Sequence, residues 1–328
     1  MFEQALLAMA SVATDPYLLF LIFATTILGV IIGVLPGLGA TTGAALLLPF
    51  TLTMDPVHAI AVLATIYVSA TFAGSITAIL INTPGTSAAA ATTFDGYPLA
   101  QKGEAGRALG VAVISSTVGG VFSVIVLCFA APLLARVAYE FRSPEYFALT
   151  VFGLSMLASI SAGGAVKNLI GGIFGVWLST IGAERVTGIE RFMFGNYELY
   201  EGLHFVPIFI GLFAISELLV QSKTVNKIVD TVSMKAVKLP TKEDYKKIWK
   251  TILRSCGIGT FIGVLPAEGA TVASMIGYSE ARRWSKNKEE FGKGSIEGIA
   301  GAEAANNSAT GGAMVPTMVF GIPGSGTT

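Results

Sequence analysis

The chain has 328 residues, of which 53% are hydrophobic and 13% are charged, and its formal net charge is +0. Soluble domains carry about 25% charged residues, so this composition excludes an ordinary soluble domain. The balanced charge also gives no basic region of the kind that binds nucleic acid.

Long apolar runs recur along the whole chain, at residues 17–35, 57–81, 106–134, 146–160, 168–182, 203–220 and 251–265. About 18 or more apolar residues are needed to cross the roughly 30 Å hydrocarbon core of a bilayer, and several of these runs are long enough. The runs are continuous rather than alternating, which favours helices over a barrel. The sequence therefore predicts an all-α polytopic membrane protein.

Two stretches interrupt the apolar sequence of the first half. Residues 33–41 read GVLPGLGAT, and residues 79–87 read ILINTPGTS, with the break at 82–87. Proline and glycine disfavour a continuous helix or strand, so each stretch predicts a broken helix. Asp95 follows in FDGYP, where a turn or a helix cap is favoured over contact with a substrate.

Charge is concentrated in the segments 221–250 and 280–294. Short loops rich in Lys and Arg stay on the cytoplasmic side, so we expect 221–250 to be a cytoplasmic basic loop. The chain between 251 and 280 must then enter the membrane and return. Two legs of about 15 residues each reach only about 22 Å, which predicts a re-entrant hairpin with LPAEGAT at its tip. A tilted pair of short spans is the alternative.

The second half repeats both breaks. Residues 263–271 read GVLPAEGAT, and Gly33 aligns with Gly263, 230 positions later, while GIPGSG at 321–326 matches the second break. Seven identities in nine positions, followed by a matching second motif, indicate a duplication. We therefore predict a first membrane half at 1–220, the basic loop at 221–250 and the start of a second membrane half at 251–328.

Paired broken segments in two halves point to a transporter binding site. A half-helix that starts at a break directs free N–H groups and a positive dipole end into a cavity, which suits an anion without any Arg or Lys. Thr42, Ser274 and Thr327 offer further hydroxyls. The predicted substrate-binding residues are Pro36, Gly37, Gly39, Ala40, Thr41, Asn82, Thr83, Pro84, Gly85, Thr86, Ser87, Gly269, Ala270, Thr271, Pro323, Gly324 and Ser325.

Two other interpretations of the breaks were weighed. A single LPGLG would be a packing kink, because small residues let membrane helices approach closely, but four breaks in two matching pairs favour the site. GLGATTG also resembles a dinucleotide-binding loop. The second copy, AEGATVA, lacks the outer glycines, and no βαβ unit surrounds either copy, so that interpretation is rejected.

Ionisable groups at membrane depth are usually functional. Glu268 lies in the second tip, and Glu303 is followed at i+3 and i+4 by Asn306 and Asn307, on one helical face. Carboxylate and amide oxygens suit a hard cation, so Glu268, Glu303, Asn306 and Asn307 are candidates for cation coupling, with Na⁺ at the last three. A protonatable Glu303 is one alternative, and a purely structural Glu303 is another.

Cysteine and histidine give no sign of chemistry. Cys128 and Cys256 lie in apolar runs without a CxxC motif, and we expect both to be buried packing residues. His58 and His204 do not suggest a metal site. Without an activated nucleophile, a metal cluster or an acid–base pair, the chain is not expected to be an enzyme.

Three blocks carry a family resemblance: GVLPGLGATTGAALLLPFT, GSITAILINTPGTSAAAATTFDGYPLAQKGEAGRALG and EAANNSATGGAMVPTMVFGIPG. Together they resemble the large membrane subunit of the tripartite tricarboxylate transporters (TctA-like), from about Leu28 to Thr328. The resemblance implies a multi-pass protein of the bacterial inner membrane that imports carboxylates such as citrate by Na⁺ or H⁺ symport. It also implies a periplasmic solute-binding protein and a small membrane subunit as partners, and no cofactor.

The sequence departs from the family pattern in two ways. Ala267 and Glu268 replace the usual PGxG at the second tip, which places a negative charge beside the predicted anion site. Family members also continue well past the second PG motif, so the chain resembles the family without its C-terminal part. The predicted function is a secondary active permease subunit, and the alternative is an anion or ion channel that uses the same half-helix sites.

Overall fold

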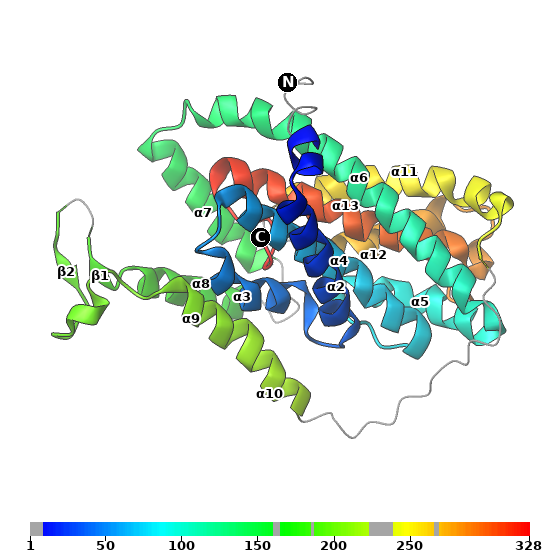
Figure 1. Cartoon of the computed structure of the whole chain (residues 1–328), viewed down its shortest axis with the longest axis horizontal. Coiled ribbons are helices and arrows are strands. Elements are labelled where there is room, and N and C mark those ends of the chain that lie inside the picture. Colours follow the sequence, from blue (N-terminus) through cyan, green and yellow to red (C-terminus); the bar gives the residue numbers. More distant parts are fainter. Residues whose placement is uncertain (1–8, 160–164, 185–186, 223–238, 266–268) are drawn as a thin grey trace.

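The computed structural model describes residues 9–159, 165–184, 187–222, 239–265 and 269–328 (Figure 1). Its α-helices are α2 (Pro16–Val34), α3 (Gly39–Thr51), α4 (Pro56–Ile81), α5 (Ala90–Leu99), α6 (Ala105–Ala138), α7 (Ser143–Ser159), α8 (Ala165–Ser179), α9 (Phe205–Phe209), α10 (Ser216–Ser222), α11 (Lys242–Val264), α12 (Gly269–Trp284) and α13 (Ile296–Phe320). Shorter 3-10 or π turns are η1 (Ser87–Ala89), η2 (Ala100–Glu104), η3 (Tyr197–Leu199), η4 (Ile210–Ile215) and η5 (Lys288–Glu290). Strands β1 (Gly182–Ala183) and β2 (Glu190–Arg191) form one antiparallel pair.

The predicted all-α membrane fold is confirmed. Among the described residues, three helical segments are long and apolar enough to cross a membrane: Pro16–Val34, Pro56–Ile81 and Ser87–Ala138. In Figure 1, α2, α4, α6, α11, α12 and α13 gather in one bundle, while α8 and the two strands extend away from it. The chain is therefore a multi-pass helical membrane protein.

Helix α13 is the centre of the bundle and packs against α4, α5, α6, α11 and α12. Nearly every residue from Ile296 to Pro316 is buried, and most of them are small. Glycines on the neighbouring helices face its backbone: a Cβ on Gly119 of α6 would meet the carbonyl oxygen of Ala304, and a Cβ on Gly277 of α12 would meet that of Gly301. Close backbone approach is the usual basis of helix packing in membranes.

Adjacent glycines on α6 allow this packing to be tested. We expect Gly119→Ala to lower the free energy of unfolding by about 1–3 kcal/mol, because its new methyl group would overlap α13. Gly120→Ala is expected to raise it by about 0.5–1 kcal/mol, because no atom lies within 4 Å of that Cβ and alanine favours a helix. Thermal unfolding of the two purified variants in one detergent measures the difference, and two shifts of the same sign would contradict this packing.

Two aspartates start the first long helices. Asp15 accepts hydrogen bonds from the N–H groups at the start of α2, and Asp55 does the same for α4, each followed by a proline. His58 lies between them, with Nε2 3.2 Å from Asp15 Oδ2 and Nδ1 3.4 Å from Asp55 Oδ1. These capping contacts fix the helix ends, since an uncapped end leaves N–H groups without partners.

The two edges of the first break have the same backbone geometry in both halves. Helices α2 and α11 end at Val34 and Val264, and the next residue, Leu35 or Leu265, donates its N–H to the carbonyl three residues earlier. The following helices, α3 and α12, both begin at a glycine with positive φ, 47° at Gly39 and 60° at Gly269. Only glycine adopts this conformation freely, which explains the glycine at this place in each copy.

The second break is also shared, at an offset of 239 rather than 230 residues. Helices α4 and α13 both end at a residue in the left-handed conformation, Asn82 with φ 53° and Gly321 with φ 67°. The N–H of the next residue donates to the same position of each helix. Thr83 N donates to Thr77 O and Ile322 N donates to Pro316 O, and both distances are 3.4 Å. At this offset SAT at 69–71 aligns with SAT at 308–310.

Helices extend into both ends of the predicted basic loop, 221–250: α10 continues to Ser222, and α11 already begins at Lys242. A capping box formed by Thr241 and Asp244 starts α11 inside the charged segment. Helix α11, which contains the predicted first leg, therefore has 23 residues and a length of about 34 Å, whereas the leg alone was expected to reach about 22 Å. Residues 266–268 of the predicted tip lie outside the described residues.

The cysteine prediction holds for one residue only. Cys256 is buried, as expected, but Cys128 is exposed on α6. An apolar run does not predict burial inside a membrane protein, because the lipid-facing side of a helix is apolar as well.

Candidate functional site

A cavity of about 220 Å³ lies where the four breaks meet. The first turns of α3 and α12 reach it through Gly39, Ala40, Thr41, Gly269, Ala270 and Thr271. Loop residues from both halves complete it, namely Thr86, Ser87 and Ala88 in the first half and Ser325, Gly326 and Thr327 in the second. Tyr67 and Thr71 of α4 form the remaining wall. Segments more than 200 residues apart in sequence thus share one small space.

Electrostatics make the cavity suitable for an anion. The first N–H groups of an α-helix have no partner within the helix, and the aligned peptide dipoles place partial positive charge at that end. Helices α3 and α12 both direct this end at the cavity. The N-cap residue of α3, Leu38, makes no side-chain hydrogen bond to the first N–H groups. None of the described residues that line the cavity is charged. Two helix ends and several hydroxyls therefore supply donors without a competing ion pair.

Hydroxyl groups join the two halves across the cavity. Thr41 Oγ1 lies 2.9 Å from Thr327 Oγ1, and Ser87 Oγ lies 3.0 Å from Thr271 Oγ1. Because Thr41 and Thr271 are equivalent in the repeat, each half contributes one helix threonine that contacts the loop of the other half. A third contact, 3.3 Å long, joins the hydroxyl of Tyr67 to Ser325 Oγ.

The structure divides the predicted substrate-binding residues into two groups. Gly39, Ala40, Thr41, Thr86, Ser87, Gly269, Ala270, Thr271 and Ser325 line the cavity. Pro36, Gly37, Asn82, Thr83, Pro84, Gly85, Pro323 and Gly324 do not. Two residues of the second group hold the backbone of the breaks in place. Gly37 N donates to Gly85 O at 3.2 Å, and Gly85 N donates to Gly74 O at 3.1 Å.

Sequence reasoning missed Tyr67, Thr71, Ala88 and Gly326 as lining residues, and named Thr327 only as a source of a hydroxyl. The repeated SAT could have indicated α4, because it marks the face of α4 and α13 that both copies share. Tyr67 is not repeated in the second half, because the residue 239 positions later is Asn306. Nothing in a single sequence predicts which way that side chain points.

Glu303 is completely buried on α13. Its two carboxylate oxygens accept hydrogen bonds from Thr92 of α5 and from Ser116 of α6, the latter 2.9 Å long. No ion pair to Glu303 is found in the described part of the chain. At membrane depth a carboxylate held only by neutral donors is costly, which makes Glu303 a candidate for binding a cation or a proton.

The two asparagines that follow Glu303 on α13 have buried amide groups whose hydrogen bonds are incomplete. Neither amide atom of Asn306 has a hydrogen-bond partner, and the same is true of Asn307 Nδ2 and of Thr86 Oγ1, although all are buried. Asn307 lines a different space, described below. Glu268 lies outside the described residues. Where the chain is described, no group of three His, Cys, Asp or Glu side chains could hold a metal.

Asp95 caps a neighbouring helix rather than its own turn. Its Oδ1 accepts hydrogen bonds from the N–H groups of Gly294 and Ser295, each 2.8 Å long, at the start of α13. The carboxylate is fully buried there. A carboxylate at a helix N-terminus is stabilised by the helix dipole, so the structural role expected from the sequence agrees with these contacts.

Comparison with known proteins gives one family. The model of the tripartite tricarboxylate transporter TctA family matches residues 19–328. An uncharacterized 52.8 kDa protein in the TAR-I ttuC' 3' region of Agrobacterium vitis is 43% identical over 305 residues, which are 92% of this chain and 60% of that protein.

A second relative, an uncharacterized protein in the TAR-II ttuC' 3' region of Agrobacterium vitis, is 48% identical over 65 residues, 20% of this chain and 27% of that protein. No solved structure matches. The chain spans about 60% of the length of the first relative.

Proposed function

The chain belongs to the tripartite tricarboxylate transporter TctA family, and on that premise we propose that it is the permease subunit of a secondary carboxylate importer. The permease imports tricarboxylates or dicarboxylates such as citrate across the bacterial inner membrane. A periplasmic solute-binding protein delivers the substrate, and a small membrane subunit completes the complex. The family is one of transporters, so no enzymatic activity is proposed.

One observation carries the proposal: two helix N-termini from related halves meet at a small cavity whose described lining has hydroxyl groups and no charged side chain. A carboxylate placed there accepts hydrogen bonds from free N–H groups, and the helix dipoles favour its charge. A second carboxylate of the same molecule meets the equivalent donors of the other half. The pairing of two such ends suits a substrate with more than one carboxylate.

The same arrangement supports alternating access. The cavity lies between the halves, and hydroxyl pairs rather than packed side chains join Thr41 to Thr327 and Ser87 to Thr271. Such pairs are modest in free energy, so a movement of the segments that line the cavity can exchange them for water. In the proposed cycle the pair on one side opens while the pair on the other side stays closed.

Coupling is assigned to a cation, Na⁺ or H⁺, at the acidic and amide residues of the second half. Glu303 is the main candidate, with Asn306 and Asn307 near it on α13 and Glu268 at the second tip. What supports this is the burial of Glu303 without a cationic partner and the unpartnered amides beside it. A buried charge of this kind is expected to be neutralised by a bound ion or proton.

Reconstitution tests the function. The chain, its small partner and the binding protein are placed in proteoliposomes, and uptake of labelled citrate and dicarboxylates is measured under a Na⁺ gradient, a pH gradient or neither. We expect uptake that requires both the binding protein and a gradient. Gradient-independent uptake would contradict the coupling, and fluxes far above carrier rates would indicate the channel.

A further inference from the structure

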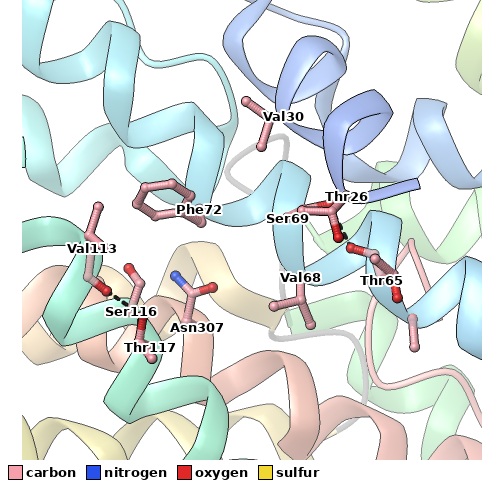
Figure 2. Close-up of a pocket in the computed structure, with 11 residues that line it drawn as sticks. Thr26, Val30, Thr65, Val68, Ser69, Phe72, Val113, Ser116, Thr117 and Asn307 are labelled. Atoms are coloured by element: carbon pink, nitrogen blue, oxygen red, sulfur yellow. Dashed lines mark hydrogen bonds between the residues drawn. The ribbon is translucent and has the colours of Figure 1, made fainter. Parts of the chain in front are cut away.

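A groove of about 500 Å³ lies between α2, α4 and α6, and Asn307 of α13 reaches it (Figure 2). It is separate from the substrate cavity and shares no lining residue with it. The apolar part of the lining is Val30, Ala64, Val68, Phe72 and Val113, and the polar part is Thr26, Thr65, Ser69, Ser116, Thr117 and Asn307.

Three of the lining hydroxyls are satisfied within their own helices. The Thr26 hydroxyl donates to Ile22 O at 2.7 Å, and the Ser69 hydroxyl donates to Thr65 O at 2.6 Å. The Thr117 hydroxyl donates to Val113 O at 2.8 Å. Such bonds are ordinary for Ser and Thr in helices and indicate no ligand. No such bond is found for Thr65, Ser116 or Asn307, and of these three Ser116 and Asn307 are buried.

Ser116 connects the groove to Glu303. Its side chain faces the groove in Figure 2, and its hydroxyl donates to Glu303 Oε2 over 2.9 Å. Asn307, one helical turn after Glu303, also lines the groove, and its Nδ2 has no hydrogen-bond partner although its side chain is 1% exposed. A buried amide without a partner at the edge of a roomy space is a place where ordered water is held.

Other titratable groups around α13 are engaged elsewhere in the described chain. Asp95 accepts the Gly294 and Ser295 amides, and Glu297 accepts from Ser285. Further groups on the surrounding helices make contacts away from Glu303: His58 and Tyr67 on α4, Arg107 on α6, Asp244, Lys247 and Arg254 on α11, and Tyr278, Glu280 and Arg283 on α12. Arg282 lies at the last turn of α12, and the buried thiol of Cys256 lies on α11. The remaining titratable residues of these helices are Tyr97 on α5, Cys128 and Arg136 on α6, and Lys242, Glu243, Tyr245, Lys246 and Lys250 on α11. None of these groups hydrogen-bonds to Glu303.

We propose that this groove is a water-filled vestibule through which a proton reaches and leaves Glu303, with the Ser116 hydroxyl as the relay; this rests on the proposed symport. A hydronium ion in the groove gives a proton to the water held by Asn307, that water passes a proton to Ser116 Oγ, and Ser116 passes its own hydroxyl proton to Glu303 Oε2. The carboxylate becomes a carboxylic acid, Ser116 and the water at Asn307 are unchanged in total, and the hydronium ion becomes neutral water. Release runs in reverse.

A proton fits this carboxylate better than Na⁺ does. A hydroxyl both donates and accepts, so Ser116 or Thr92 can turn to accept from the protonated acid without any movement of the backbone. Sodium requires several oxygen ligands around one point, whereas both hydroxyls direct their hydrogens at the carboxylate and would have to turn before they could act as ligands. Glu303 is therefore assigned as the proton-carrying group, and H⁺ as the ion that it couples.

Water access is tested on the chain itself, without any transport. In a background with Cys128→Ser and Cys256→Ala, Val68→Cys places a thiol in the groove and Phe23→Cys places one on the outer face of α2, where Phe23 is 67% exposed. A charged methanethiosulfonate is expected to react with the groove thiol at least about tenfold faster. Equal slow reaction at both positions would show a dry groove and overturn the proposal.

The relay is tested in the proteoliposomes described above. We expect Ser116→Ala to slow uptake driven by a pH gradient at least about tenfold while exchange of external for internal substrate is unchanged, and Ser116→Thr to restore uptake. Thr117→Ala, one residue away in the same groove, is the control and is expected to transport normally. Normal uptake by Ser116→Ala, or wild-type uptake driven by Na⁺ alone, overturns the proton route. Absence of any wild-type uptake counts instead against the proposed function.

Discussion

Replacing Thr41 and Thr271 together by valine is expected to lower the initial rate of carboxylate uptake about 100-fold at low substrate concentration. Each hydroxyl lies in the first turn of a helix that begins at the cavity, where it can donate to a carboxylate. A hydrogen bond to a charged group contributes about 1.5–3 kcal/mol, and about 1.4 kcal/mol corresponds to a tenfold change. Each single variant should therefore lose about tenfold, and the two losses should multiply if the sites act independently.

Valine keeps the shape of threonine, so this experiment separates binding from folding. The matched control is Thr51→Val, on the same helix as Thr41, because Thr51 is buried and its hydroxyl bonds only to Leu48 O, 2.9 Å away. It should fold and transport normally. A double variant that accumulates in the membrane like wild type and transports at the same rate would show that the carboxylate binds elsewhere.

Glu303→Gln is expected to abolish accumulation against a gradient and to leave substrate exchange within a few fold of wild type. Glutamine has the shape of glutamate and can still bond to Thr92 and Ser116, but it cannot take up a proton or balance a cation. Uptake should then stop when internal and external concentrations are equal. The measurement compares accumulation under a gradient with exchange at equilibrium in one preparation.

The helix provides its own control for this variant. Glu297 is buried on α13, and its Oε2 accepts a hydrogen bond from Ser285 over 2.6 Å, so it is also a buried glutamate bonded to a hydroxyl. Glu297→Gln should accumulate substrate normally. If Glu303→Gln accumulates as well as wild type does, the coupling ion binds elsewhere, and Glu268 becomes the residue to replace next.

The breaks are the part of the fold that the sequence predicted in detail. Prolines and glycines in apolar sequence indicated where the helices end, and α2, α4, α11 and α13 do end within or at the edge of the predicted stretches. This worked because backbone conformation at glycine and proline is a local property. The start of α11 was missed although its capping box, Thr241 and Asp244, is local too, because a charged segment was interpreted as a loop.

The sequence by itself determined that the chain is a multi-pass helical membrane protein of two related parts, with breaks rich in hydroxyls. Only the tertiary structure decided which residues meet. Thr41 and Thr327 are neighbours although 286 residues separate them, and Tyr67 faces the cavity while Pro36 does not. The same holds for Glu303, whose partners Thr92 and Ser116 lie on two other helices. Hydropathy and the effects of proline and glycine act over a few residues. A site in a helix bundle depends on how each helix is rotated about its axis and where it crosses its neighbours.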